Sequence, residues 1–304
     1  MKIGLVTDSG SDLPWDFAKE NDVKIACMTM FVHDEELKED ENFDREAYYK
    51  LFEEEKAFLH IPKLNLYSFV PKTSQPNPKD YSDAYLEHIK EGKKEIVVVT
   101  VSGGLSGSVN SAHLAAKQVM RQHKDVKIFV VSSLSASYPE VFLIRMALKL
   151  IAKKKYSGEE IAEILTKQAL KIKTIILLPT LRYLWKGGRL GTSKFLLGAM
   201  LRKKPIVTMN EEGNVVPAGS AKDVQKGLQE ALRLSTDDFT KVPKNITIVY
   251  GSSLEYANNM AEIIKEKYPT MDIEIAQSGG SVLSHLGPES IGVISDYTDK
   301  EYWE

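Results

Sequence analysis

The segment Glu95–Lys117, EIVVVTVSGGLSGSVNSAHLAAK, contains the strand–loop–helix unit that decides the fold class. Its beginning, EIVVVTV, is a continuous apolar run, which is typical of a strand covered on both faces. The loop SGGLSGS (102–108) follows, and the helix-like run after it reaches about His123. A buried strand that passes through a short loop into a helix predicts a βα unit of a parallel sheet.

The same alternation extends outward from this unit in both directions. Apolar runs at 2–7, 24–32 and 126–133 predict further strands. Between the second and the central strand, residues 44–59 have apolar positions at helical spacing. We therefore expect a mostly parallel sheet with helices on both faces.

The regular alternation of predicted strands and helices ends near Lys171. A strand predicted at 174–179 is followed by turn-rich sequence, and two extended runs around Glu212-Gly213 predict a hairpin. Fewer helical connections between consecutive strands are predicted here, which favours a mixed sheet over a parallel one. The chain is thus predicted to be an α/β protein of two α/β domains, residues 1–172 and 173–304, with a ligand cleft between them.

Bulk composition excludes several classes of function. The 304 residues carry a net charge of −2 at pH 7, so no basic excess indicates a nucleic acid partner. The single cysteine, Cys27, excludes an intrachain disulfide and a cysteine-rich zinc site, and no histidine or glutamate spacing indicates a metal. No signal-peptide pattern occurs, and no apolar stretch reaches the roughly 18–20 residues of a membrane helix. We expect a soluble, cytoplasmic protein without a metal or another cofactor.

The glycine loop at 102–108 is a candidate anion site. A helix N-terminus offers unpaired N–H groups, and Ser102 and Ser106 add hydroxyl donors. An ordinary βα turn with Ser106 or Ser108 as the helix N-cap explains the pattern about equally well. The loop lacks the lysine of a Walker A motif and the glycine spacing of a dinucleotide site. It misses the Gly-x-Ser-x-Gly nucleophile elbow only at Ser108.

Two other stretches place polar side chains near the expected cleft. In TSQPNP (73–78), Pro76 favours an extended backbone that would present Thr73 and Ser74, although an ordinary turn fits as well. In TDSGSDL (7–13), Asp8 follows the first strand. It is either a catalytic carboxylate or, as is more common, a side chain that holds neighbouring loops.

Basic and titratable candidates lie in the second half of the chain. Lys186 and Arg189 flank two glycines in LWKGGRLG (184–191), where they would either pair with an anion or form a solvated turn. His285 precedes Gly-Pro in SHLGPES (284–290), a setting that no other histidine of the chain shares.

In their order along the chain, five segments resemble the successive motifs of the DegV family: KIGLVTDSGSDLP, TSQPNP, VSGGLSGSVNSAHLAA, LWKGGRLG and SHLGPESIGV. The resemblance covers nearly the whole chain. It implies two α/β domains that bury one long-chain fatty acid between them, without enzymatic turnover of their own. It also implies a partner, as in Gram-positive bacteria: a separate ATP-binding fatty acid kinase subunit that converts the presented carboxylate to an acyl phosphate for phospholipid synthesis.

The resemblance assigns roles to individual residues. The implied carboxylate-binding residues are Thr73, Ser74, Ser102, Gly103 and Ser106. Arg189 and His285 are implied in partner docking or in presentation of the carboxylate. A transient contact with a membrane surface is compatible with this role, and no nucleic acid partner is implied.

An acyl chain would need an apolar tunnel. Burial of each methylene contributes about 0.8 kcal/mol, so a sixteen-carbon chain would contribute on the order of 10 kcal/mol before the costs of association. The segments KFLLGAMLRK (194–203) and VFLIRMAL (141–148) would suit its wall. Apolar helix stripes usually form core, however, and core is the favoured interpretation of both.

The sequence departs from the family pattern at several places. Ser132-Ser133 stands where Asp-Ser is usual, the segment around Ser220 lacks an arginine, and Glu289 replaces a glycine. These departures bear on docking of the kinase subunit more than on lipid binding.

Two other classes of function stay open. One is a serine hydrolase that uses Ser106, His285 and Asp8, which would have to converge within hydrogen-bond reach. The other is a small-molecule substrate domain related to dihydroxyacetone kinases, with His285 as the anchor of its substrate.

Overall fold

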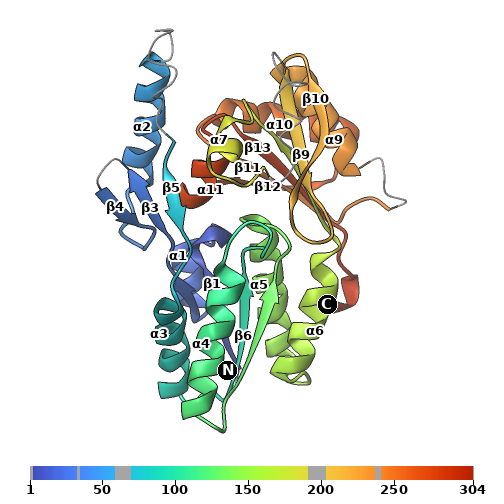
Figure 1. The fold of residues 1–304 in the computed structure, drawn as a ribbon. Coiled ribbons are helices and arrows are strands. Elements are labelled where there is room, and N and C mark those ends of the chain that lie inside the picture. The colour runs from blue at the N-terminus through green and yellow to red at the C-terminus, as the bar shows by residue number, and fades with distance from the viewer. Residues whose placement is uncertain (1–2, 33–34, 59–69, 191–202, 237–240, 304) are drawn as a thin grey trace.

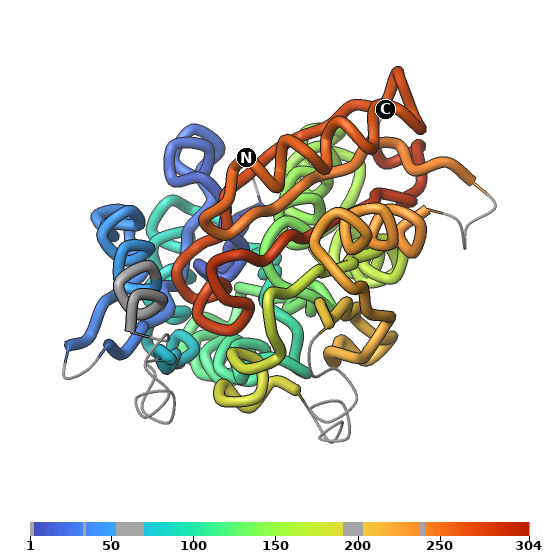
Figure 2. The backbone as a smooth tube through the Cα atoms, turned by 90° about the horizontal axis from the view of Figure 1, so that it is seen from above, coloured from blue at the N-terminus to red at the C-terminus, as the bar shows by residue number. Residues whose placement is uncertain are grey.

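The computed structural model describes residues 3–32, 35–58, 70–190, 203–236 and 241–303. It confirms an α/β protein with one parallel and one mixed sheet. In Figure 1 the first domain forms the lower half of the molecule and the second lies above it. Figure 2, seen from above, shows the red and orange chain of the second domain over the first, with a blue arm to one side.

The first domain is built on a parallel sheet of order β2-β1-β6-β7. One face is covered by α3 (Pro78–Lys90) and α4 (Ser108–Gln122), and the other by α1, α5 and α6 (Figure 1). The remaining elements are β1 (Ile3–Asp8), η1 (Ser9–Ser11), α1 (Trp15–Glu20), β2 (Val23–Ala26), β6 (Glu95–Thr100), β7 (Lys127–Ser132), α5 (Tyr138–Ala152) and α6 (Gly158–Ala169).

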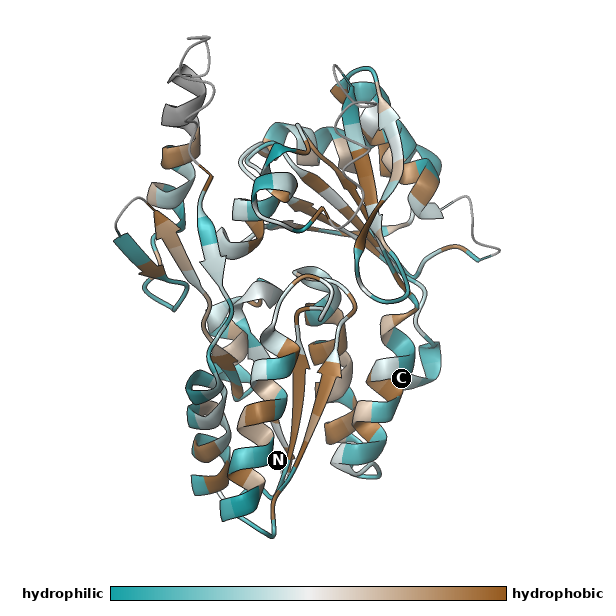
Figure 3. Ribbon diagram, in the orientation of Figure 1, coloured by the Kyte–Doolittle hydropathy of each residue, from teal (hydrophilic) through white to brown (hydrophobic). Residues whose placement is uncertain are grey.

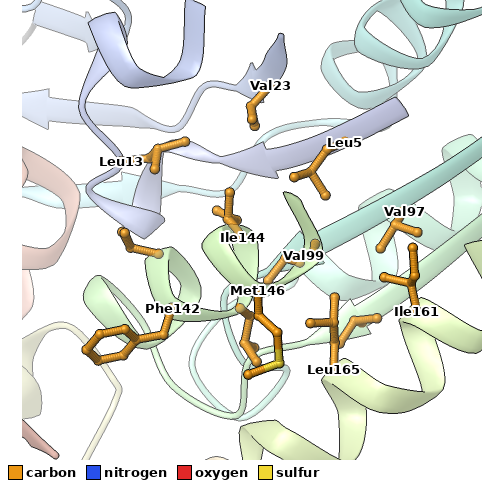
Figure 4. Close-up of a cluster of buried hydrophobic side chains, with 14 of the residues drawn as sticks. Leu5, Leu13, Val23, Val97, Val99, Phe142, Ile144, Met146, Ile161 and Leu165 are labelled. Carbon is orange, nitrogen blue, oxygen red and sulfur yellow. The ribbon is translucent and has the colours of Figure 1, made fainter. Parts of the chain in front are cut away.

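Both faces of this sheet are buried, which explains the continuous apolar runs. Val97 and Val99 of β6 pack against α5 and α6, whereas Ile96 and Val98 pack against α3 and α4. Figure 4 shows the first cluster, where side chains of α5 and α6 meet those of β1 and β6. In Figure 3 these central strands are brown along most of their length. The segment 141–148 contributes to this core and does not line the cavity described below.

The single strand predicted at 24–32 is wrong: the structure has two strands in different sheets. β2 ends at Ala26, and β3 (Thr29–Val32) belongs to an antiparallel sheet of order β4-β3-β5. Between them, the Met28 N–H donates to the hydroxyl of Ser9 at 2.9 Å. The arm outside the first domain consists of this sheet, with β4 (Glu35–Lys38) and β5 (Lys72–Ser74), and of α2 (Arg45–Phe58).

The second domain is built on a six-stranded sheet of order β10-β9-β8-β13-β11-β12. β11 and β12 pair in parallel, and the other pairs in the described part of the chain are antiparallel. The outer face is covered by α9 (Val224–Thr236) and α10 (Leu254–Lys267). The other elements are β8 (Ile172–Leu177), α7 (Arg182–Lys186), β9 (Lys204–Met209), β10 (Val215–Ala221), β11 (Asn245–Tyr250), β12 (Asp272–Gln277), α11 (Gly280–Leu286), β13 (Ile291–Asp296) and η2 (Lys300–Tyr302).

The predicted hairpin is confirmed as β9–β10, and Gly213 in its turn has a φ of +73°, which favours glycine. The sheet begins at Ile172, but Tyr302 and Trp303 return to pack on the core of the first domain. The division between residues 172 and 173 therefore stays a prediction. The predicted helix at 194–203 lies, up to residue 202, outside the described residues. Among the described helices, none is long and apolar enough to cross a membrane.

Candidate functional site

A cavity lies between the two domains, at the carboxyl ends of the first domain's parallel strands. Its empty space is about 940 Å³, counting the part that opens to solvent. Gly10, Val101 and Ser135 line it from the segments that directly follow β1, β6 and β7. Open α/β sheets bind their ligands at this edge, so the cavity is the candidate site.

The inner face of the second sheet forms the floor of the cavity. Alternate residues of its strands point to opposite sides, so that Ile175 and Val293 enter the core under α9 and α10 while their neighbours face the cavity. The floor residues are Thr174 and Ile176 of β8, Met209 of β9, Val215 of β10, Val249 of β11, and Gly292 and Ile294 of β13. Most of this surface is apolar, which suits a hydrocarbon ligand.

A threonine–histidine pair lies in the wall of the cavity. Thr73 Oγ1 of β5 and His285 Nε2 of α11 lie 2.7 Å apart, and both side chains line the cavity. Burial, and then the charge of Arg189, lowers the pKa of His285 to about 3, so its ring is neutral at physiological pH. Its Nδ1 is buried and has no partner among the described residues.

The environment of His285 decides its tautomer. A buried N–H without a partner is rarer in proteins than a buried lone pair without one, so we assign the ring proton to Nε2. His285 then donates to Thr73 Oγ1. The hydroxyl proton of Thr73 stays free to be donated to a ligand.

Arg189 lines the same cavity and is half-buried. Its Nε donates to the carbonyl of Leu105 at 3.0 Å, and its Nη1 donates to the carbonyl of Gly187 at 2.5 Å. Burial lowers its pKa, and no carboxylate of the described residues pairs with it. A cation that is partly removed from water without a counter-charge favours a bound anion.

The serines of the glycine loop divide between the cavity and the domain interface. Ser106 lines the cavity, and its Oγ lies 2.9 Å from Ser108 Oγ. Ser102 is fully buried and does not line the cavity; its hydroxyl donates to the carbonyl of Gly213 in the β9–β10 turn at 2.8 Å. The N-cap of α4 is Gly107, so neither Ser106 nor Ser108 caps the helix.

The structure thus brings together four of the predicted site residues. Thr73, Ser106, Arg189 and His285 line one cavity, although Thr73 and His285 are 212 residues apart in the chain. Three predicted residues, Ser74, Ser102 and Gly103, do not line it. Ser74 Oγ donates to the carbonyl of Gln75 at 3.3 Å, and Gly103 is exposed. The roles of all seven stay predictions.

Sequence reasoning missed Gln75, Gly187 and the whole cavity floor. A Cβ on Gly187 would lie far inside van der Waals contact with His285 Nδ1, so glycine lets the imidazole approach this turn. Its neighbour Gly188 has a φ of +76°, so glycine is favoured there by the backbone instead. The sequence did contain a signal for the floor: in each strand of the second domain, every second residue faces the same side of the sheet.

The geometry of a serine hydrolase is not formed by the predicted residues. Ser106 Oγ contacts Ser108, and His285 contacts Thr73, so serine and histidine are not paired. Asp8 is buried; it accepts from the Tyr81 hydroxyl at 2.9 Å and from the Val101 N–H at 3.1 Å. Burial raises the pKa of Asp8 to about 6. Asp8 holds loops together, as the alternative interpretation expected.

Two buried carboxylates of the N-terminal half hold the start of α11, the helix that carries His285. Asp12 Oδ1 accepts the N–H of Gly279 at 2.8 Å, and Glu39 Oε1 accepts the N–H of Ser281 at 3.0 Å. Burial, and then the charge of Glu39, raises the pKa of Asp12 to about 7, and burial also raises the pKa of Glu39. These contacts fix α11, and with it His285, against the first half of the chain.

A second polar cluster, on the surface of the first domain, is satisfied internally. Asp22, His88 and Glu91 could together hold a metal ion. The ammonium group of Lys93 lies among them, 2.8 Å from His88 Nδ1 and 2.9 Å from Glu91 Oε2, and also contacts Asp22. Lysine therefore supplies the positive charge at this cluster.

Known proteins share both the sequence pattern and the fold. The model of the DegV family matches residues 2–297. A fatty acid-binding protein of Thermotoga maritima is 26% identical over 300 residues, which cover 96% of this chain and 96% of that protein. A fatty-acid-binding DegV family protein from Thermus thermophilus has 26% identity and a TM-score of 0.82, with 97% of this chain and 99% of the other covered. The Streptococcus pneumoniae fatty acid kinase B3 protein, loaded with linoleic acid, has 25% identity and a TM-score of 0.76, with coverage of 98% and 100%.

Proposed function

This chain belongs to the DegV family, and from that premise we propose that it binds one long-chain fatty acid in the cavity between its domains. One observation carries the proposal: the wall of an apolar cavity contains, beside neutral hydroxyl donors, a guanidinium that has no carboxylate partner among the described residues. The apolar floor would accept any hydrocarbon. Arg189 and the hydroxyl donors add selection for a terminal anion.

In the proposed complex the carboxylate lies between Thr73, Ser106 and Arg189. Thr73 donates its hydroxyl proton because His285 supplies the other hydrogen bond to its oxygen. Arg189 provides the counter-charge. Ser102 and Gly103 act from outside the cavity, since the Ser102 hydroxyl binds the β9–β10 turn and so holds the glycine loop in place. The acyl chain runs over the floor of the second sheet.

We further propose that the chain has no turnover of its own and presents the carboxylate to a separate ATP-binding kinase subunit. The resemblance to the fatty acid kinase B3 protein supports this role. The donors proposed for the carboxylate are mostly neutral, which leaves a carboxylate oxygen nucleophilic enough to attack a phosphoryl group. Trp185, four residues before Arg189 in the chain, is 49% exposed and offers an apolar side chain to a partner. A cytoplasmic location, where ATP is available, belongs to this proposal.

Lipid mass spectrometry of the purified protein tests the binding proposal. Mild denaturation is expected to release a single class of long-chain fatty acid. Several preparations without an acyl chain, together with no binding of added fatty acids, would contradict it. The kinase proposal is tested separately with radiolabelled ATP: acyl phosphate is expected only when the loaded protein and the ATP-binding subunit are both present.

The Gly187→Ala variant is expected to bind fatty acid roughly 2- to 12-fold more weakly, the loss that corresponds to one net hydrogen bond of about 0.5–1.5 kcal/mol. The added methyl would lie inside contact distance of the His285 imidazole and 2.9 Å from the Tyr183 carbonyl oxygen, so the ring and the turn move apart. Thr73 then loses the contact that orients its hydroxyl. Isothermal titration calorimetry measures the change.

Gly188→Ala is the matched control, since a Cβ there meets nothing within 4 Å. Its strained φ is expected to lower stability by about 1 kcal/mol and to leave affinity unchanged. Equal losses of affinity in the two variants would argue against a role of His285.

A further inference from the structure

Gly292 is the second residue of β13 and forms a gap in the cavity floor. Its partners across the sheet are Ile176 of β8 and Val249 of β11. Along the chain, Ser290 lies two residues before Gly292, just ahead of β13, and Ile294 of β13 lies two residues after it. All four neighbours line the cavity together with Gly292. The floor therefore has a slot one side chain wide, surrounded by larger side chains.

Neither the backbone nor the packing of the described residues requires glycine at this position. The φ of Gly292 lies outside the left-handed region, and a Cβ there would lie 3.6 Å from the Val249 carbonyl oxygen, which is an ordinary contact. Gly227 and Gly280 differ, because a Cβ on either would lie 2.7 Å from a neighbouring side chain. Glycine weakens a strand interior and often marks a place where another molecule approaches closely.

We propose that the slot over Gly292 holds part of the acyl chain and that the missing side chain sets the longest acid the cavity accepts. The inference rests on the proposed function and names a specificity-determining residue for it. A Cβ at position 292 would lie 3.7 Å from the Val249 Cβ. Opposite Cβ atoms in antiparallel pairs are about 4.5–5.5 Å apart, so the Cβ atoms of Ile176 and Val249 lie roughly 8–9 Å apart across the slot. A single polymethylene chain fits between two such side chains with contact on both sides.

Substitution at Gly292 is expected to shorten the accepted chain. Saturated acids of about 10 to 18 carbons are titrated into the wild-type protein, Gly292→Ala and Gly292→Val. Each displaced methylene corresponds to about a 4-fold loss of affinity, so alanine costs about 4-fold and valine, with three added carbons, about 50-fold for the longest acids. Acids too short to reach the slot are expected to bind all three proteins within about 2-fold. Valine is favoured in strands, and thermal melting verifies that the variants fold.

Gly219→Ala is the matched control on the same sheet. Gly219 lies in β10, does not line the cavity, and a Cβ there would lie 3.6 Å from Leu234. It is expected to leave the length profile unchanged. If the valine variant shows the wild-type dependence of affinity on acid length, or loses affinity equally for acids of every length, the proposed role of the slot is wrong while the proposed function stands. Wild-type protein that binds no acid of any length overturns the proposed function and this inference with it.

Discussion

Replacing Arg189 with methionine is expected to lower the affinity for long-chain fatty acids by roughly 10- to 150-fold at neutral pH. The half-buried guanidinium donates to the carbonyls of Leu105 and Gly187 and has no carboxylate partner in the described part of the chain. A bound carboxylate would supply the counter-charge, and a hydrogen bond to a charged group contributes about 1.5–3 kcal/mol. Methionine retains much of the apolar stem, so the cavity wall is preserved.

Lys186→Met removes the same charge from an exposed position on the same turn and serves as the control. Its affinity for fatty acid, measured by calorimetry beside that of Arg189→Met, is expected to stay within about 2-fold of the wild type, as for most surface substitutions. If Arg189 serves only in partner docking, its variant will keep full affinity and lose only acyl phosphate formation. That result would contradict the role of Arg189 as counter-charge.

Asp12→Asn is expected to become more stable relative to the wild type as pH rises from about 5 to 7. Burial, and then the charge of Glu39, raises the pKa of Asp12 to about 7 from its ordinary value of 3.8. The folded wild type therefore holds this proton more tightly than the unfolded chain does. The stabilisation is fully present below the unfolded pKa and is lost as pH rises through the folded pKa. At about 1.4 kcal/mol per pH unit, the difference in unfolding free energy should change by about 2–3 kcal/mol.

The comparison with a variant is needed because other groups titrate in the opposite sense. The pKa of His285 is lowered to about 3, so its contribution to stability grows as pH rises toward the ordinary histidine value. Subtracting the wild-type profile removes that contribution. Asparagine tolerates the left-handed φ of 58° at position 12, and its carbonyl oxygen can still accept the Gly279 N–H.

Urea unfolding at several pH values measures the Asp12 effect. Asp16→Asn, at an exposed position of α1, is the control and is expected to show a flat difference from the wild type. A flat profile for Asp12→Asn as well would show that the Asp12 carboxyl is ionised throughout this pH range in the folded protein.

The segment 24–32 shows where sequence patterns stop being informative about the fold. Its apolar run continues through Met28, although the chain leaves the first sheet after Ala26 and enters another at Thr29. Apolar patterning reports that a residue is buried. It does not report which strand lies beside it, because the ladder partner comes from a distant part of the chain.

The glycine loop shows the same limit for the candidate site. Glycines and serines between a buried strand and a helix were enough to predict a site there. Ser102 and Ser106 are chemically alike and four residues apart, so the sequence could not separate them. In the folded protein the carbonyl of Gly213, from the second domain, accepts the hydrogen bond of the Ser102 hydroxyl, whereas Ser106 lines the cavity.

The sequence by itself determined the two α/β domains, the parallel character of the first sheet, the β9–β10 hairpin and the loops in which polar candidates lie. These properties depend on neighbouring residues, since periodicity and turn chemistry act within a segment. The tertiary structure decided that Thr73 meets His285, that Arg189 has no carboxylate partner among the described residues, and that Gly292 leaves a slot in the floor. Each of these depends on contacts between segments far apart in the chain, which local patterns do not encode.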